Sequence, residues 1–287
     1  MIKSAGRARA AQFPSAALKP KTWNLSPETC NAMSVHHGDF MQLAPYLPQG
    51  EAALVYIDPP FFSGRKRRNR APGPSYDDRW PGGLAEYLGF LRGLLTAVRP
   101  LLTPHGVLAL HLDWRAAHHG RFELERLLGA GAFVNEIIWS YRTGGGSKRS
   151  LGRKHDSIHV FASGPEYTFH QLREKSYLAH RYGFKNIEIH EDEQGLYTWA
   201  AMRDVWEIPA LRGNQKEYAG YPTQKPLALL SRLVECFSSP GDLVLDPCCG
   251  SGSALVAAKR LGRRVLGVDS SGDAVALAIR RLSECDG

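Results

Sequence analysis

The chain has 287 residues, 43% of them hydrophobic, and a formal net charge of +8. This length and apolar content suit one main domain with a small insertion, and the charge indicates an anionic partner. No apolar run approaches membrane-spanning length, and residues 1–21 lack the apolar stretch of a secretory signal, so we expect a soluble cytoplasmic protein. Five cysteines without a Cys-x-x-Cys spacing argue against a disulfide framework or a structural zinc site.

A basic segment opens the chain. It carries five lysines and arginines and no acidic residue before Glu28. This charge pattern predicts that residues 1–25 form a flexible basic arm.

The first predicted strand is the apolar run Leu54–Ile57, which ends on the tetrapeptide Asp58-Pro59-Pro60-Phe61. The tetrapeptide brings together a carboxylate, two backbone carbonyls held rigid by proline, and an aromatic ring. By itself it is better explained as a strand end and an Asp-Pro turn above a packed Phe61. Its meaning therefore depends on the rest of the chain.

A basic cluster begins four residues after Phe61, and the Gly/Pro-rich stretch Ala71–Pro74 follows it. A charge run of this kind is often a solvated surface. A loop that starts at the tetrapeptide must nevertheless lie close to whatever the tetrapeptide binds, so we favour contact with phosphates. The proposed contacts are Arg65, Lys66, Arg67 and Arg68.

Helical and strand patterns alternate in the middle of the chain. Helical spacing runs over Leu84–Val98 and Phe122–Leu128, and strand-like runs cover Val107–Leu112, Asn135–Tyr141 and Ile158–Phe161. This alternation predicts crossovers between largely parallel strands of one sheet.

Three histidines, His111, His118 and His119, together with Asp113 could suggest a metal site. No zinc-enzyme spacing such as H-E-x-x-H is present. We therefore predict solvated or capping histidines and no metal.

A second basic cluster spans Arg142–His155 and contains three consecutive glycines, Gly144–Gly146. The glycines allow the backbone to adapt, so we expect the segment to be mobile until an anionic partner binds. Its candidate contacts are Lys148, Arg149, Arg153 and Lys154. The stretch 164–218 that follows mixes aromatic with basic residues.

The C-terminal part reads as strand, glycine turn, helix and strand. Leu243–Leu245 runs into the loop 246–252, the Ala-rich stretch Ala254–Leu261 follows, and Val265–Val268 ends on Asp269. Glycines in such a loop let the backbone approach a ligand, the helix start offers unpaired N–H groups, and a carboxylate after the next strand suits ribose hydroxyls. The pattern predicts a nucleoside-binding site. One amphipathic segment, Asp273–Leu282, completes the chain.

These blocks, in this order, resemble those of the beta-class DNA amino-methyltransferases, in which a catalytic tetrapeptide precedes the cofactor loop. Further matching blocks are His37-Gly38-Asp39 ahead of the first predicted strand, Asn135–Trp139 leading to Lys154-His155-Asp156, and Tyr221–Pro226. The departures are Cys248 where the family usually has Phe, Ser253 where Thr is common, and Phe61 in place of the more frequent Tyr.

The resemblance implies an α/β fold with a doubly wound, mostly parallel, Rossmann-like methyltransferase sheet and a circularly permuted motif order. Residues 26–163 and 219–287 would form the catalytic domain and 164–218 a target-recognition insertion. The implied reaction transfers a methyl group from S-adenosylmethionine to the exocyclic amine of a base flipped out of double-stranded DNA. The location would be the nucleoid. A homodimer and a companion restriction endonuclease stay open as partners.

The resemblance also assigns roles. Asp58 and the carbonyl of Pro59 would accept the N–H bonds of the amine, Pro60 would keep them rigid, and Phe61 would stack on the base. Both basic clusters would contact DNA. Cofactor contacts are expected at Asp39, Asp58, Thr223, Lys225, Asp246, Cys248, Gly250, Gly252, Ser253 and Asp269.

Several alternatives remain. A nicotinamide site would need a third glycine at position 255, which is Leu255. The pair Pro247-Cys248 is similar to the nucleophile of enzymes that methylate carbon 5 of cytosine, but it lies inside the cofactor loop, so we predict that Cys248 and Cys249 are packing groups. Adenine N6 is the favoured target because Asp-led tetrapeptides in similar enzymes are mostly adenine-specific; cytosine N4 is the alternative. An RNA or protein amide N-methyltransferase and an inactive DNA-binding module are more distant possibilities.

Overall fold

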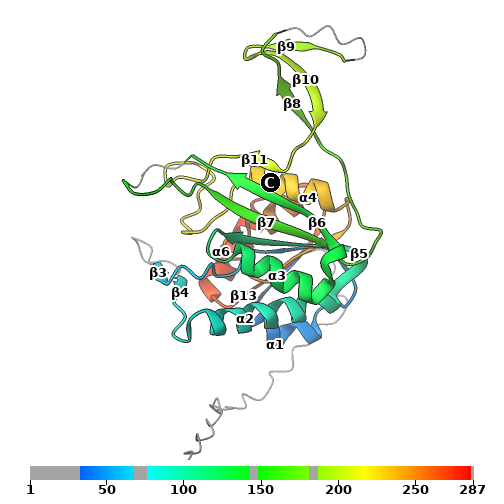
Figure 1. Ribbon diagram of the computed structural model, residues 1–287. Coiled ribbons are helices and arrows are strands. Elements are labelled where there is room, and N and C mark those ends of the chain that lie inside the picture. Colours follow the sequence, from blue (N-terminus) through cyan, green and yellow to red (C-terminus); the bar gives the residue numbers. More distant parts are fainter. Residues whose placement is uncertain (1–32, 68–75, 143–147, 181–186, 286–287) are drawn as a thin grey trace, which may run out of the picture.

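The structure is a computed structural model that describes residues 33–67, 76–142, 148–180 and 187–285 (Figure 1). The predicted basic arm, Arg68, Ala71–Pro74 and Gly144–Gly146 lie outside the described residues. None of the described helices combines the length and the apolar character needed to cross a bilayer.

The described residues form an eight-stranded central sheet with the order β1-β13-β12-β2-β5-β7-β6-β11. Neighbouring strands are parallel, except that β7 runs against both β5 and β6. This arrangement confirms the predicted mostly parallel α/β sheet. The strands are β1 (Met33–His37), β13 (Arg264–Asp269), β12 (Leu243–Asp246), β2 (Ala52–Ile57), β5 (Leu102–Asp113), β7 (His155–Ala162), β6 (Phe133–Ser140) and β11 (Val205–Glu207).

Helices cover both faces of the sheet (Figure 1). Along β2, Leu54 and Tyr56 pack in the core on the α4–α6 face, whereas Val55 and Ile57 pack in the core on the α1–α3 face, as the alternation of a strand buried on both sides requires. The helices are α1 (Phe40–Leu43), α2 (Gly83–Val98), α3 (Ala117–Leu128), α4 (Leu227–Phe237), α5 (Ser253–Arg260) and α6 (Gly272–Ser283), with short 3-10 turns at Ala44–Tyr46, Arg99–Leu101 and Ala130–Ala132.

Two small sheets extend from this body. β3 (Arg65–Arg67) pairs antiparallel with β4 (Tyr76–Asp78), so the first part of the basic cluster is a short strand and not the loop that the sequence suggested. β8 (Arg173–Tyr177), β10 (Gly195–Ala201) and β9 (His190–Asp192) form a three-stranded sheet that projects from the main body (Figure 1).

Several elements of the main body, including β1, α1, α4 and β11, were not predicted. β1 precedes Gly38-Asp39, so the first described strand lies twenty residues earlier than Leu54–Ile57. α4 was not predicted, although Leu229, Leu230, Leu233, Val234 and Phe237 follow helical spacing and are buried.

The topology gathers acidic residues at one edge of the sheet. Asp113, Asp246 and Asp269 are the last residues of β5, β12 and β13, and Asp58 directly follows β2. Because these four strands are parallel, their carboxyl ends lie at the same edge, where ligands of such sheets bind.

Candidate active site

A cavity of about 540 Å³ opens at this edge, a volume within the usual range for small-molecule sites. Asp58 and Asp246 both line it, although 188 residues separate them along the chain (246 − 58). Among the predicted catalytic and cofactor residues, those that line the cavity are Asp39, Asp58, Pro59, Pro60, Phe61, Thr223, Lys225, Asp246, Cys248, Gly250, Ser253 and Asp269.

The loop after β12 is held against the end of β13 by backbone N–H groups. Gly250 N–H donates to Asp269 Oδ2 at 2.8 Å, and Ser271 N–H donates to Asp269 Oδ1 at 2.8 Å. Cys248 N–H donates to Asp246 Oδ1 at 3.1 Å. The two carboxylates therefore fix the shape of the loop, and their remaining lone pairs are available to a ligand.

Burial sets the protonation of this loop. It raises the pKa of Asp269 and raises the pKa of Asp246 well above the ordinary carboxyl value, with the neighbouring carboxylate Asp58 adding to the shift of Asp246. Burial likewise raises the pKa of the Cys248 and Cys249 thiols well above the ordinary value. Neither thiol is held as a nucleophilic thiolate, in line with the predicted packing role.

Gly252 has a different role from the other predicted cofactor residues. It does not contribute to the lining of the cavity. It adopts the left-handed conformation, with φ of 74°, at the start of α5, and a Cβ at this position would lie 2.8 Å from Ala278 Cβ of α6. Its missing side chain thus lets α5 and α6 pack closely beside the loop.

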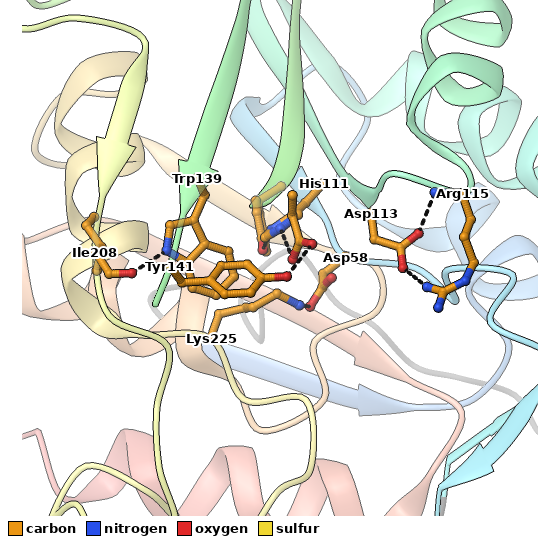
Figure 2. A network of polar contacts seen from close by, with 10 residues as sticks. Asp58, His111, Asp113, Arg115, Trp139, Tyr141, Ile208 and Lys225 are labelled. Atoms are coloured by element: carbon orange, nitrogen blue, oxygen red, sulfur yellow. Dashed lines mark hydrogen bonds and ion pairs between the residues drawn. The ribbon is translucent and has the colours of Figure 1, made fainter. Parts of the chain in front are cut away.

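Asp58 forms an ion pair with Lys225 across the cavity. Lys225 Nζ lies 2.5 Å from Asp58 Oδ2 (Figure 2). It also lies 4.9 Å from the centre of the Phe61 ring. Both charged side chains are largely buried, so the pair is shielded from water. Lys225 therefore holds the carboxylate and the ring of the tetrapeptide in one arrangement.

The loop that carries Lys225 is itself fixed by its neighbour Gln224. Its side-chain nitrogen donates to the carbonyl of Glu217 at 2.7 Å, and its side-chain oxygen accepts from Ala219 N–H at 2.7 Å. The Glu217 carboxylate accepts from Leu227 N–H at 2.7 Å, at the start of α4. These bonds place Thr223 and Lys225 at the cavity.

The backbone after the tetrapeptide is anchored by a residue that sequence reasoning missed, Asp78. Its carboxylate accepts from Phe62 N–H at 3.1 Å, Ser63 N–H at 2.7 Å and the Trp80 indole at 2.9 Å. Phe62 has a positive φ of 58°, which is unfavourable for a bulky residue. The bonds from Phe62 and Ser63 to Asp78 hold it in this strained conformation, and the Trp80 indole fixes the Asp78 carboxylate.

A buried polar network supports the tetrapeptide from behind. The Tyr56 hydroxyl lies 2.7 Å from His111 Nδ1, His111 Nε2 lies 3.3 Å from Asp156 Oδ2, and the Tyr141 hydroxyl donates to Asp156 Oδ1 at 3.0 Å. The His111 ring packs beside Phe61, with ring centres 5.8 Å apart. Because an ionised Asp156 can only accept, His111 donates through Nε2.

His111 corrects a sequence-based prediction. It is fully buried, whereas we predicted a solvated or capping histidine; His118, by contrast, is exposed. The signal was present, because His111 lies between Leu110 and Leu112 in a strand with both faces covered. Among the described residues, no group of three or more His, Cys, Asp or Glu side chains is arranged to hold a metal ion.

Of the predicted DNA contacts, Arg65 begins β3, and Lys148, Arg149, Arg153 and Lys154 precede β7, whose first residues pair with the carboxyl end of β5. Arg65, Lys148, Arg149 and Arg153 are exposed, and Lys154 is half-buried. The side chains of Lys66 and Arg67 lie outside the described part of the structure. Arg153 stacks over Trp114, a residue that follows β5 and that sequence reasoning also missed.

Comparison with known proteins identifies the family. A model of the DNA methylase family for N6 and N4 methylation matches residues 52–280, most of the chain. The chain belongs to this DNA methylase family. The resemblance inferred from the motifs is confirmed, and the chain is an N6/N4 type amino-methylating DNA methylase.

Individual relatives are more distant. The type II methyltransferase M.HpaI of Haemophilus parainfluenzae is 28% identical over 243 residues, which cover 84% of this chain and 71% of that relative. Two solved structures share the fold of this DNA methylase. The PvuII DNA methyltransferase (cytosine-N4-specific) has a TM-score of 0.63 and 17% identity, covering 87% of this chain and 86% of that one. The M1.HpyAVI–SAM complex has a TM-score of 0.58 and 19% identity, covering 87% and 98%.

Proposed function

We propose that this DNA methylase transfers the methyl group of S-adenosylmethionine to the exocyclic amine of a base flipped out of double-stranded DNA, and that adenine N6 is the favoured target. The observation that carries the proposal is the opening of the Asp58 tetrapeptide and the glycine loop into one cavity. Flipping is required because the amine is otherwise paired and stacked inside the duplex.

The cavity fits a positively charged nucleoside cofactor. Its lining includes the carboxylates of Asp39, Asp246 and Asp269, which suit hydroxyl and ammonium groups. At Gly250 a Cβ would lie 3.1 Å from the Tyr221 ring, so glycine keeps this wall of the cavity open. S-adenosylmethionine, when bound, supplies a methyl group already activated by a positive sulfur. This chain's residues therefore need to align the amine and accept its proton.

Asp58 and Pro59 activate the amine. The lone pair of an exocyclic amine is delocalised into the base, which makes the nitrogen a poor nucleophile. Asp58 Oδ2 is bound by Lys225, and no described residue donates to Oδ1, which is free to accept one N–H of the amine. The carbonyl of Pro59 accepts the other. Two rigid acceptors draw the nitrogen toward a tetrahedral geometry, and Asp58 receives the proton that the amine releases.

Phe61 offsets the cost of flipping. Extruding a base costs a few kcal/mol, and stacking on an aromatic ring returns about 1–3 kcal/mol. The Phe61 ring is held by His111 on one side and Lys225 on another, so little conformational freedom is lost when a base stacks on it.

We also propose that residues 164–218 provide target recognition and that the catalytic domain comprises 26–163 and 219–287. The three-stranded sheet of this segment exposes Tyr177 and Trp199, side chains suited to DNA contact. β11 lies in the same range but pairs with β6 in the central sheet, so the end of the insertion is integrated with the catalytic domain. Cytoplasmic location at the nucleoid, a homodimer and a companion endonuclease remain predictions.

A labelling experiment tests the proposal. Plasmid DNA is incubated with the purified chain and S-adenosylmethionine that carries a deuterated methyl group, and the DNA is digested to nucleosides for mass spectrometry. We expect labelled N6-methyladenine. Labelled N4-methylcytosine in place of N6-methyladenine would show that the target is cytosine N4 and not adenine N6. Label in RNA or protein with none in DNA would overturn the proposal, as would DNA binding with no label anywhere.

A further inference from the structure

Trp114 is an exposed aromatic residue at the edge of the active site. It directly follows β5, and 40% of its surface is exposed. Two guanidinium groups lie over its indole ring: Arg153 Cζ is 3.9 Å and Arg115 Cζ is 4.7 Å from the ring centre. Contacts of this type at such distances are attractive, and they restrict the orientation of an otherwise flexible arginine.

The topology places this group beside the cavity. Asp113, the residue before Trp114, lines the cavity. Arg153 lies two residues before the start of β7. Because β7 is antiparallel to β5, the start of β7 pairs with the end of β5, and Asp156 lies opposite Asp113. Two segments that are far apart in sequence thus meet beside the cavity that a flipped base would enter.

The charges of the two arginines are used differently. The guanidinium of Arg115 pairs with the carboxylate of Asp113, which also accepts from Arg115 N–H at 2.9 Å. Arg153 has no carboxylate partner among the residues that the structure describes, and its side chain is exposed. An arginine that is oriented by stacking and lacks an anion can bind one through its N–H groups, and a phosphate fits this geometry.

We propose that Trp114 and Arg153 form a phosphate clamp that grips the DNA backbone next to the flipped nucleotide. The proposal rests on the function given above, because only a flipped substrate brings its flanking phosphates to this entrance. Trp114 acts through its ring, which orients Arg153; Arg115 and Asp113 fix Trp114 to the end of β5. The clamp contacts the backbone and therefore adds affinity without reading the sequence.

The test measures the salt dependence of binding to a fluorescein-labelled duplex of mixed sequence. The slope of log affinity against log salt concentration is negative, and Arg153→Gln should make it shallower by about 0.9, the value for one lost phosphate contact. Trp114→Leu removes no charge but should make the slope shallower to a similar extent, because Arg153 is then no longer oriented toward the phosphate. Trp114→Phe should keep the slope near that of the wild type.

The matched control is Arg121→Gln. Arg121 also stacks on an aromatic ring, 3.6 Å from the centre of Phe133, but at the amino end of β6 and so toward the opposite edge of the sheet. The Arg121→Gln variant removes the same charge as Arg153→Gln and should leave the slope unchanged. An equal effect of the two arginine variants would show a general charge effect and overturn the clamp.

Two further outcomes decide the proposal. A Trp114→Leu variant with wild-type slope and affinity would overturn it. Weaker binding of this variant at an unchanged slope would also overturn it, because that result would mean that the indole contacts a base directly. All variants should bind S-adenosylmethionine like the wild type, which shows that they are folded. If the wild type labels DNA but the slopes do not change, the clamp fails while the proposed function stands; if the wild type labels no DNA, the proposed function fails first.

Discussion

The two halves of the cavity are held together in different ways. In the proposed cofactor half, at the ends of β12 and β13, the two aspartate carboxylates bond to residues close in sequence: Asp246 to Cys248, Asp269 to Ser271, and Asp269 to Gly250, which are 2, 2 and 19 residues apart. The backbone at the end of β13 also pairs with the end of β1, where Gly38 N–H donates to the Asp269 carbonyl. In the target half, around β2, β5 and β7, side chains pair over 167, 55 and 45 residues, in Asp58–Lys225, Tyr56–His111 and His111–Asp156.

This difference has a functional meaning. In the cofactor half, local turns and backbone pairing between strands fix the carboxylates. The target half depends on tertiary contacts between side chains, and a change in any one of them alters the position of Phe61 or Asp58. Variants should therefore separate cofactor binding from methyl transfer, and the following predictions test that separation.

The largest effect is expected in the target half. Asp58→Ala removes an acceptor for the amine and should lower the rate of methyl transfer at least about 100-fold. The dissociation constant of S-adenosylmethionine, measured by calorimetry, should stay within a few-fold of the wild type. A parallel loss of cofactor binding and transfer would contradict the separation of the two halves.

Gly252→Ala should damage the cofactor half. The added methyl group meets Ala278 of α6 in a left-handed conformation, so the unfolding free energy should fall by about 1–3 kcal/mol more than in a control without the clash. Gly241→Ala is that control, because Gly241 has φ of 87° and no atom within 4 Å of the added Cβ. Denaturation and calorimetry should show lower stability and weaker cofactor binding; equal stability of the two variants would rule out the clash.

His111→Ala tests the network behind Phe61. It leaves the buried Tyr56 hydroxyl without its partner and leaves Asp156 with Tyr141 alone, so we expect the unfolding free energy to fall by about 1–3 kcal/mol. Methyl transfer should slow while the affinity for S-adenosylmethionine changes little. His118→Ala, at an exposed position of α3, should leave both unchanged. If cofactor affinity fell as far as the rate, the network would belong to both halves.

The smallest effect is a gain of stability in Asp246→Asn. Burial raises the pKa of Asp246, so the folded state binds its proton more tightly than the unfolded chain does, and wild-type stability falls as the pH rises toward that raised pKa. The amide carries no charge to bury, and the variant should be more stable by about 1 kcal/mol at neutral pH, with weaker cofactor binding. Denaturation at several pH values should show the difference shrinking toward acid; a constant difference would exclude a charge effect.

The same contrast explains what the sequence could predict. Glycines and carboxylates at strand ends form short patterns, and the predicted strands and helices of the C-terminal part match β12, α5, β13 and α6 closely. Nothing in the local sequence indicates that Asp156 and Tyr56 share His111, because such pairs depend on which strands become neighbours. Arg153 was predicted as a DNA contact on its charge, but its support by Trp114 needed the antiparallel pairing of β5 and β7.

The strand order also determines when this protein can become active during synthesis. β1 pairs with β13, and β12 lies between β13 and β2. Strands β1 and β2 are therefore synthesised well before their partners β13 and β12. Until β12 emerges from the ribosome, one edge of β2 is unpaired, and such an edge invites aggregation. On the roles proposed for Lys225 and the glycine loop, a nascent chain that lacks them cannot methylate DNA, so activity is confined to molecules that have completed their fold.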